Sequence, residues 1–221
     1  MSEGRTGPGT GLLLDAAGTL LRPAVAVAQT YAEHARRFGV EIEASHVAAR
    51  FGSAMREAAP LRRRDDDGGD WTEFWATVVA RSTGCDAPAL VTELIEHFAA
   101  PAAWTVAPGA ERCCARVRAT GTKIAVVSNW DRRLRPLLTG LGVLDWIDVL
   151  VVSGEEGLEK PDPALFTRAC ARLGVLPDRT VHVGDDPVAD VEGARAAGCA
   201  ALWFGHDVAD FDALAQQLLG S

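Results

Sequence analysis

Short, largely apolar runs occur five times along this chain. They lie at 12–14, 123–127, 148–152, 180–183 and 200–204. Runs of this length, bounded by glycine or polar residues, are typical of strands buried on both faces of a parallel sheet. A segment with helical spacing precedes each of the last four runs, at about 110–117, 132–138, 162–173 and 188–197, and another follows at 211–219. We therefore predict an α/β fold with a parallel sheet of about five strands and helices on both faces.

Between residues 21 and 104 the apolar pattern is helical throughout. Apolar side chains recur every three or four residues in four runs, at 24–38, 46–59, 71–79 and 90–98. Gly39 ends the first run and Pro101 follows the last, as expected at helix ends. No strand pattern is present in this stretch. We predict an all-helical domain of residues 21–104, inserted after the first strand into an α/β core of residues 1–20 and 105–221.

Composition and charge narrow the class of protein. The chain has 221 residues, of which 48% are hydrophobic, which is enough to bury a full core. The net charge of −8 argues against binding nucleic acid or an anionic membrane, because both need basic surface. The leader 1–11 is polar and no apolar run is long enough to span a membrane, so we expect a cytoplasmic protein. We expect it to be a monomer or a homodimer. Five cysteines without CxxC spacing indicate neither a disulfide framework nor a zinc site.

Polar residues follow four of the predicted strands. They are Asp15 after the first strand, Ser128 and Asn129 after the second, Lys160 after the third, and Asp185, Asp186 and Asp190 after the fourth. The carboxyl ends of parallel strands meet at one edge of a sheet, where such folds bind ligands. A nucleophilic carboxylate, a hydroxyl, a lysine and a group of acids suit phosphoryl transfer with a divalent cation. Carboxylate oxygens are hard ligands that suit Mg²⁺.

These segments resemble the four sequence motifs of the haloacid dehalogenase superfamily. The matching segments are Leu12–Leu20, Ser128-Asn129, Lys160-Pro161-Asp162-Pro163, and Gly184-Asp185-Asp186 with Asp190. They occur in the superfamily's order and cover nearly the whole chain. The helical insert resembles the C1-type cap of the first subfamily, and the core is expected to be Rossmann-like. The resemblance implies a hydrolase that acts on a small phosphorylated substrate.

The resemblance also implies a role for each motif residue. Asp15 would be the nucleophile that forms an aspartyl phosphate, and Ser128 and Lys160 would bind oxygens of the transferred group. Ala16, Gly18, Thr19 and Asn129 would help to bind the phosphate. The implied Mg²⁺ ligands are Asp15, the backbone carbonyl of Ala17, and Asp185, with Asp186 and Asp190 close to the metal.

Ala17 departs from the pattern of the superfamily's phosphatases. Those enzymes usually carry a second aspartate here, which protonates the leaving group and then activates water. The backbone carbonyl of Ala17 can still bind a metal, but the acid/base step, typically contributing about 10² to 10⁴ in rate, has no side chain here.

Three enzymatic interpretations remain open. The first is a phosphatase for substrates with a good leaving group, or one whose acid comes from elsewhere, with His34, His46 and His97 as candidates in the insert. The second is a phosphonate hydrolase, which needs a lysine in the cap, whereas Lys123 and Lys160 are the only lysines in the chain. The third is a dehalogenase, which needs no Mg²⁺. In such an enzyme Asp185, Asp186 and Asp190 would only place repelling negative charge near the nucleophile.

A fourth interpretation is a protein with weak catalysis that binds a phosphorylated ligand or a partner.

Two other features have simpler explanations than a role at the site. The charged run 62–67 is typical of a solvated loop, although its arginines could meet an anionic substrate. Trp71, Phe74 and Trp75 recur at helical spacing, which favours packing inside the insert over lining a pocket.

Overall fold

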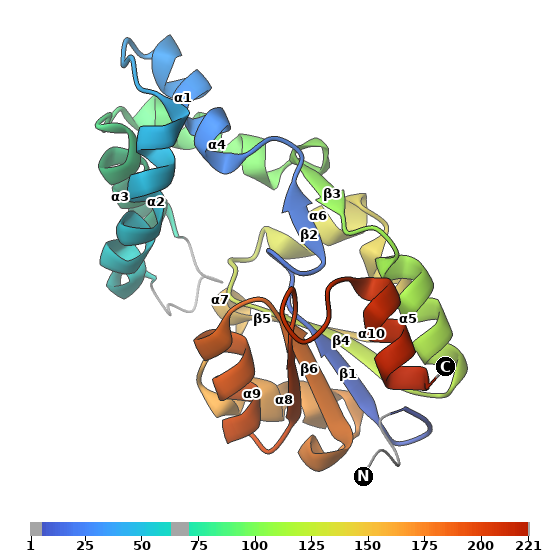
Figure 1. Cartoon of the computed structure of the whole chain (residues 1–221). Helices are drawn as coiled ribbons and strands as arrows, with labels where there is room; N and C mark the ends of the chain where they lie inside the picture. Colours follow the sequence, from blue (N-terminus) through green and yellow to red (C-terminus); the bar gives the residue numbers. More distant parts are fainter. Residues whose placement is uncertain (1–5, 63–70, 221) are drawn as a thin grey trace.

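The core of the protein is a five-stranded parallel sheet. A computed structural model describes residues 6–62 and 71–220. The strand order is β5-β4-β1-β6-β7, with every neighbouring pair parallel. The strands are β1 (Gly11–Leu14), β4 (Lys123–Ser128), β5 (Val149–Val152), β6 (Thr180–Gly184) and β7 (Ala200–Trp203). This confirms the predicted α/β fold, and helices lie on both faces of the sheet (Figure 1).

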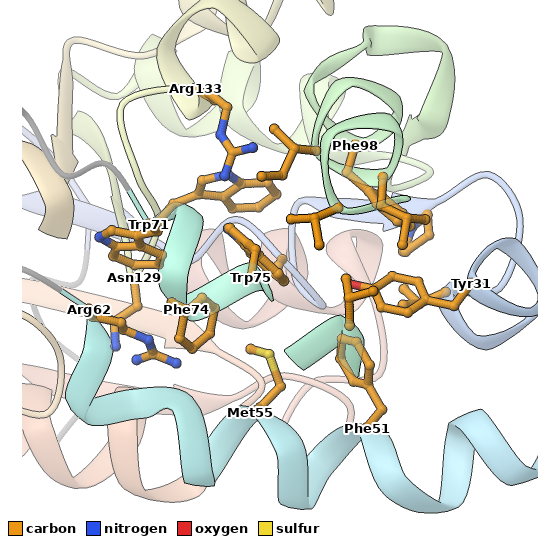
Figure 2. A pocket seen from close by; sticks show the side chains of 18 of the residues that line it. Tyr31, Phe51, Met55, Arg62, Trp71, Phe74, Trp75, Phe98, Asn129 and Arg133 are labelled. Atoms are coloured by element: carbon orange, nitrogen blue, oxygen red, sulfur yellow. The ribbon is translucent and has the colours of Figure 1, made fainter. Parts of the chain in front are cut away.

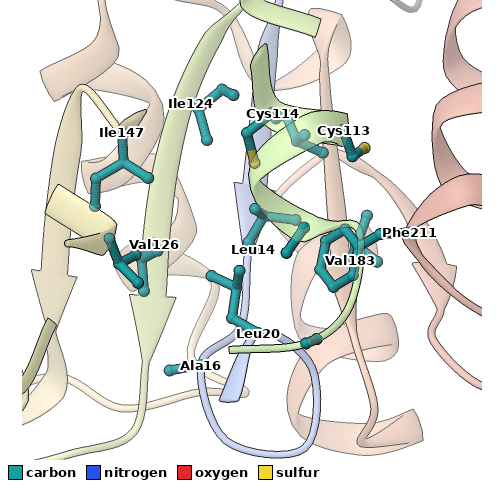
Figure 3. Packing of buried hydrophobic residues seen from close by; sticks show 14 of the residues in the cluster. Leu14, Ala16, Leu20, Cys113, Cys114, Ile124, Val126, Ile147, Val183 and Phe211 are labelled. Atoms are coloured by element: carbon teal, nitrogen blue, oxygen red, sulfur yellow. The ribbon is translucent and has the colours of Figure 1, made fainter. Parts of the chain in front are cut away.

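Strand β1 lies at the centre of the sheet and is buried on both faces. Leu14 is in register with Val126 of β4 on one side and with Val183 of β6 on the other. Leu12 and Leu14 pack toward α5 (Ala110–Ala119) and α10 (Phe211–Leu219), as Figure 3 shows for part of this cluster. Leu13 points to the opposite face, toward α8 (Pro163–Leu173) and α9 (Gly193–Ala196). Burial on both faces explains why this strand is continuously apolar.

Four helices form a separate cluster away from the sheet (Figure 1). They are α1 (Val27–Arg37), α2 (Ala44–Ala58), α3 (Thr72–Thr83) and α4 (Pro88–Ala99). Tyr31, Phe74, Leu90 and Leu94 are among the fully buried side chains of this cluster. We call α1–α4 the helical module. The module has its own apolar core because each helix carries one apolar stripe that must be buried against the others.

A two-stranded antiparallel ribbon joins the helical module to the sheet. Strand β2 (Leu21–Pro23) pairs with β3 (Trp104–Val106), with Leu21 opposite Val106. The prediction that 21–104 contains no strand is therefore wrong at both ends of that range. Strands of three residues are too short to show an alternating pattern, and Pro23 gave no strand signal.

The remaining elements are short. They are α6 (Leu134–Gly140), α7 (Ser153–Glu156), a π-helical segment (Pro187–Glu192), and four 3₁₀ turns (Ala59–Leu61, Pro101–Ala103, Val143–Trp146 and Pro177–Arg179). The helix predicted over 188–197 is thus the π-helical segment followed by α9. All five cysteines are unpaired and buried. Within residues 6–62 and 71–220, no helix combines the length and the apolar character needed to cross a membrane.

Candidate active site

Asp15 follows strand β1 directly and lies almost completely buried at the carboxyl end of the sheet. Its backbone amide donates to the carbonyl of Val183 on the neighbouring strand (2.9 Å). Its side-chain Oδ1 accepts from Ser128 Oγ at 3.2 Å and from Lys160 Nζ at 2.5 Å. The side chains predicted to act on one phosphoryl group, Asp15, Ser128 and Lys160, therefore meet at one point.

Lys160 bridges two carboxylates. Its Nζ lies 2.5 Å from Asp15 Oδ1 and 2.5 Å from Asp190 Oδ1, and its side chain is only 3% exposed. Burial opposes the charged ammonium, but attraction to Asp15 and Asp190 outweighs burial and raises the pKa of Lys160. Lys160 is therefore a fixed positive charge beside the nucleophile.

Asn129 holds the backbone of Lys160 in place. Its Oδ1 accepts from the Lys160 amide (2.8 Å) and its Nδ2 donates to the Lys160 carbonyl (2.9 Å). The two bonds use both ends of the side-chain amide. In this structure Asn129 positions Lys160, a contact that differs from the direct phosphate contact expected from the motif.

Three carboxylates converge at this edge of the sheet. Oxygens of Asp15, Asp185 and Asp190 all lie within 4.8 Å of one another. Burial, reinforced by the negative charges of Asp190 and Asp185, raises the pKa of Asp15 to about 6, although Lys160 opposes the shift. Burial also raises the pKa of Asp185. For Asp190, Lys160 and His182 overcome the effect of burial and hold the pKa well below its usual range.

The donor set at this cluster fits a hard divalent cation. Carboxylate oxygens are the ligands that Mg²⁺ prefers, and the raised pKa values of Asp15 and Asp185 show that burial, with repulsion between the carboxylates, disfavours their charged forms, which a bound cation would stabilise. Asp190 is already engaged, because its Oδ1 bonds Lys160 and His182 and its Oδ2 accepts from the Asp186 amide (3.0 Å). Asp15 and Asp185 are therefore the carboxylates best placed to bind Mg²⁺ directly.

Asp186 does not join this cluster. Its Oδ1 accepts from the amides of Val188 and Ala189, both at 2.8 Å, and so caps the π-helical segment. Capping of this kind is the usual role of an aspartate before a helix. The structure therefore brings together three of the four aspartates predicted at the metal and gives Asp186 a different contact.

The loop after Asp15 turns back sharply on itself. Leu21 N donates to the Ala16 carbonyl (2.7 Å), and Gly18 N donates to the Leu21 carbonyl (2.9 Å). Gly18 has φ +90°, and a Cβ at this position would overlap the Asp185 carboxylate, so only glycine fits. Thr19 is buried and donates to Asp185 Oδ1 at 3.4 Å. Gly18 and Thr19 thus orient Asp185.

A cavity of about 380 Å³ opens between the sheet edge and the helical module. Ala17, Gly18, Asn129 and Asp185 line its end near the nucleophile. Most of the remaining wall is apolar and comes from α1–α4, including Tyr31, Phe51, Met55, Phe74, Trp75 and Phe98, labelled in Figure 2. Ala17 is exposed, so the residue that departs from the phosphatase pattern faces this space.

The aromatic run of α3 has two roles. Trp71 and Phe74 are buried in the core of the module, and both also line the cavity together with Trp75. Their rings meet edge to face, with centroids 5.5 Å apart for Trp71 and Phe74 and 4.9 Å for Phe74 and Trp75. The packing favoured by the helical spacing is therefore confirmed, and the same three side chains also line the cavity.

Two arginines also line the cavity. Arg62 Nη1 lies 3.2 Å from Glu159 Oε2, and its guanidinium lies 4.8 Å from the ring centroid of Phe74. Arg133 Nε donates to Asp131 Oδ1 at 2.8 Å, and a second Arg133 nitrogen bonds the other oxygen of this buried carboxylate. Of the charged run 62–67 only Arg62 is described, and residues 63–67 lie outside the described part of the chain. Both arginines therefore already have a carboxylate partner.

No histidine is among the described residues that line the cavity. His34 lies on the module surface, 3.4 Å from Glu93, and stacks edge to face on His97. Asp185 is the only carboxylate of the described lining, and the phenol of Tyr31 has its pKa raised by burial. Because Asp185 is the carboxylate best placed to bind the metal, the described lining supplies no further carboxylate or imidazole to replace the missing aspartate at Ala17.

His182 is a residue of the site that sequence reasoning missed. It is fully buried in β6, and its Nε2 donates to Asp190 Oδ1 (2.9 Å). Burial lowers its pKa, so the neutral ring holds Asp190 against Lys160. The available signal was a histidine inside an apolar strand, Thr180–Gly184, two residues before the Gly184-Asp185-Asp186 motif.

Comparisons with known proteins agree with this geometry. A sequence profile of the haloacid dehalogenase-like hydrolase family matches residues 10–198. "Haloacid dehalogenase-like hydrolase domain-containing protein 3" of Mus musculus is 36% identical over 200 residues, which are 85% of this chain and 78% of the relative. A phosphoserine phosphatase of Thermus thermophilus is 39% identical over 119 residues, which are 53% of this chain and 48% of that enzyme.

Solved structures share the fold. A phosphatase of the same superfamily from Thermococcus onnurineus superposes with a TM-score of 0.65 at 26% identity, covering 96% of this chain and 98% of that one. The L-2-haloacid dehalogenase of Xanthobacter autotrophicus superposes with a TM-score of 0.68 at 21% identity, covering 96% of this chain and 83% of that one. At that identity the second likeness extends to the fold alone.

Proposed function

This chain belongs to the haloacid dehalogenase-like hydrolase family, and from that premise we propose that it is a Mg²⁺-dependent phosphatase acting on a small phosphorylated substrate. One observation carries the proposal: Ser128 and Lys160 both contact Asp15 Oδ1, beside the Asp185 and Asp190 carboxylates. A buried carboxylate held by a hydroxyl and an ammonium is a nucleophile in a fixed orientation. The phosphatase relatives from Thermus and Thermococcus support this reaction type.

In the proposed first step, the Asp15 carboxylate attacks phosphorus. A bond forms between an Asp15 oxygen and phosphorus, the bond to the leaving oxygen breaks, and the electron pair departs with that oxygen. Lys160 and Ser128, which now contact Asp15 Oδ1, are placed to stabilise oxygens of the transferred group. Mg²⁺, held by Asp15, Asp185 and the Ala17 carbonyl with Asp190 nearby, would neutralise charge on the phosphoryl oxygens.

In the second step, water attacks the phosphorus of the aspartyl phosphate. The bond between phosphorus and Asp15 breaks, phosphate is released, and the Asp15 carboxylate is regenerated. Phosphatases of this superfamily are expected to use an aspartate at the position of Ala17 to protonate the leaving group and activate this water. We propose that the enzyme is therefore restricted to leaving groups that depart without protonation, and that its second step is slow.

We also propose that residues 21–104 act as a cap domain over the site, on a core of residues 1–20 and 105–221. The cavity supports this proposal, because its wall combines residues of α1–α4 with Ala17, Asn129 and Asp185 at the sheet edge. Arg62 of the module also pairs with Glu159, the residue before Lys160. The cap would exclude water from Asp15 during phosphoryl transfer.

The proposal is tested by a Mg²⁺-dependent screen of phosphate esters whose leaving groups span a wide range of acidity. Activity should be confined to acidic leaving groups and should be lost in Asp15→Asn. The variant Ala17→Asp should raise turnover of alkyl phosphates by about 10² to 10⁴, because it supplies the missing acid/base. No change in Ala17→Asp would contradict the assignment of the missing role to this position.

A second candidate function is the binding of a phosphorylated ligand without useful turnover. The observation that favours it is the lack of any acid/base candidate among the described lining residues beside Ala17. It predicts a flat activity screen together with tight binding of a phosphorylated compound. Halide release from a 2-haloacid would overturn both candidates.

A further inference from the structure

We infer that the substrate is an aryl phosphate, a phosphate monoester of a phenolic hydroxyl on a bulky aromatic group that carries no further charge. This inference rests on the proposed function, because it names the group that the phosphatase would release. Three features carry it: the apolar wall of the cavity, the pairing of its two arginines, and the chemistry at Ala17.

The wall of the cavity is built for flat apolar groups. Tyr31 of α1, Phe51 and Met55 of α2, Trp75 of α3 and Phe98 of α4 surround the space shown in Figure 2. A cavity of ~150 Å³ with an apolar wall is enough to hold benzene, so about 380 Å³ accommodates a fused or substituted ring. The hydroxyl groups of a sugar phosphate would lose their hydration against this wall, and among the described lining residues only Arg62 Nε and Trp71 Nε1 are buried donors without a hydrogen-bond partner.

The two arginines of the wall do not call for a second anionic group on the substrate. Among the described residues, Arg133 engages both oxygens of the buried Asp131 and Arg62 Nη1 engages Glu159, while the buried Arg62 Nε has no hydrogen-bond partner and can meet a neutral acceptor on the substrate. The Arg62 guanidinium also lies 4.8 Å from the ring centroid of Phe74 and 5.3 Å from that of Trp71. In this arrangement Arg62 extends the aromatic surface, because a planar guanidinium stacks on rings. The substrate therefore fits best if its charge is confined to the phosphate.

The reaction end of the cavity favours a phenolic leaving group. When the bond between phosphorus and the leaving oxygen breaks, the electron pair stays on that oxygen, and no side chain at Ala17 can supply a proton. A phenol has a pKa of about 10, so a phenolate can depart unprotonated and take a proton from water afterwards. An alkyl alkoxide is far more basic, close to hydroxide with its parent pKa of ~15.7, and needs a donor. The shape of the cavity and the missing acid thus select the same class of substrate.

The test compares four phosphates on the full chain with Mg²⁺. Relative to phenyl phosphate, 2-naphthyl phosphate has a leaving group of similar acidity and more apolar surface, so its kcat/KM should be at least ~10-fold higher. Relative to 2-naphthyl phosphate, (2-naphthyl)methyl phosphate has similar apolar surface but an alkyl oxygen, so its kcat/KM should be lower by at least ~10². Glucose 6-phosphate should be the poorest substrate because it has neither the apolar surface nor the acidic leaving group.

Acetyl phosphate separates failure of this inference from failure of the proposed function. Its leaving group is acidic and too small to need the cavity, so a phosphatase with Asp15 as nucleophile should hydrolyse it, and Asp15→Asn should not. Hydrolysis of acetyl phosphate, with 2-naphthyl phosphate no better than glucose 6-phosphate, overturns the inference and leaves the proposed function standing. No Asp15-dependent hydrolysis of any of these compounds overturns both.

A pair of tryptophan variants on α2 links the selectivity to the cavity. Met55→Trp fills the cavity and should lower the ratio of 2-naphthyl to acetyl phosphate kcat/KM by at least ~10-fold. Ala49→Trp places the same side chain on the exposed face of the helix and should leave this ratio unchanged. If Met55→Trp does not fold, Ile95→Phe narrows the cavity from α4 and takes its place. An unchanged ratio in a folded cavity-filling variant would contradict the inference.

Discussion

Without divalent cations, the free energy of unfolding should fall as the pH rises from about 4 to about 7. Over this range Asp15 must ionise while it is buried beside two other carboxylates. Burial, with the charges of Asp190 and Asp185, raises the pKa of Asp15 from its usual 3.8 to about 6. Between these two values the native state keeps a proton that the unfolded chain has lost. The contribution of Asp15 to the free energy of unfolding is therefore highest below about pH 4 and falls as the pH rises through about 6.

The size of this effect follows from the shift in the pKa of Asp15. A shift of one unit corresponds to 1.36 kcal/mol, so about two units cost roughly 3 kcal/mol of stability. Asp15 is only 5% exposed, so solvent screens little of this cost. Asp190 alters the result little, because its lowered pKa keeps it ionised in the native state and its ordinary pKa of 3.8 leaves it mostly ionised in the unfolded chain above about pH 4.5. Asp185, whose pKa burial also raises, acts in the same direction as Asp15. His182 acts in the opposite direction, since its lowered pKa makes stability rise as the pH approaches 6.5.

The assay is urea unfolding with a chelator present, at about pH 4.5 and about pH 7, for the wild-type protein and for Asp15→Asn. Subtracting the variant removes the contribution of His182 and isolates that of Asp15. We expect the wild-type protein to lose about 2 kcal/mol more than the variant over this range, because part of the full ~3 kcal/mol is already lost below about pH 4.5. At neutral pH, Mg²⁺ at about 100 times its Kd should return about 2.7 kcal/mol to the wild-type protein. Equal pH dependence in both proteins, or no effect of Mg²⁺, would refute the account of the acidic cluster.

Three further substitutions test the contacts around this cluster. Lys160→Met leaves two buried carboxylates without their partner, so the free energy of unfolding in urea at neutral pH should fall by about 3–5 kcal/mol. A loss below about 1 kcal/mol would argue against the bridge between Asp15 and Asp190. Asp186→Ala removes a helix cap and should lower the free energy of unfolding by about 0.5–2 kcal/mol, while the Mg²⁺ concentration for half-maximal turnover stays unchanged. A large rise in that concentration would instead identify Asp186 as a metal ligand. Gly18→Ala should displace the Asp185 carboxylate and weaken Mg²⁺ binding measured by calorimetry, and unaltered binding would show that the loop tolerates a Cβ.

The sequence predicted the fold and the meeting point of the motifs because both depend on strand ends. A continuous apolar run that stops at Asp15 predicts a strand buried on both faces with a carboxylate at its end, and β1 confirms this prediction. Ser128 and Lys160 follow neighbouring strand ends and therefore reach the same carboxylate. Parallel topology brings these segments to one edge of the sheet, and Asn129 then holds Lys160 in place.

The directions of individual side chains could not be predicted in this way. Asn129 and Asp186 lie in matching motifs, but one bonds the backbone of Lys160 and the other caps a helix. Such contacts depend on local backbone geometry, which motif spacing does not specify. That Trp71 and Phe74 both pack in the module and line the cavity could not be predicted either, because helical spacing identifies an apolar face but not whether a cavity lies against it.

The most direct test of the central claim is to look for a phosphoryl group on Asp15. The protein would be mixed with acetyl phosphate and Mg²⁺, quenched with acid during turnover, and analysed by peptide mass spectrometry. Because Ala17 offers no base for the second step, we expect the aspartyl phosphate to accumulate on the peptide that contains Asp15, and to be absent in Asp15→Asn. Release of phosphate without any modification of Asp15, or a phosphoryl group on another residue, would contradict the account.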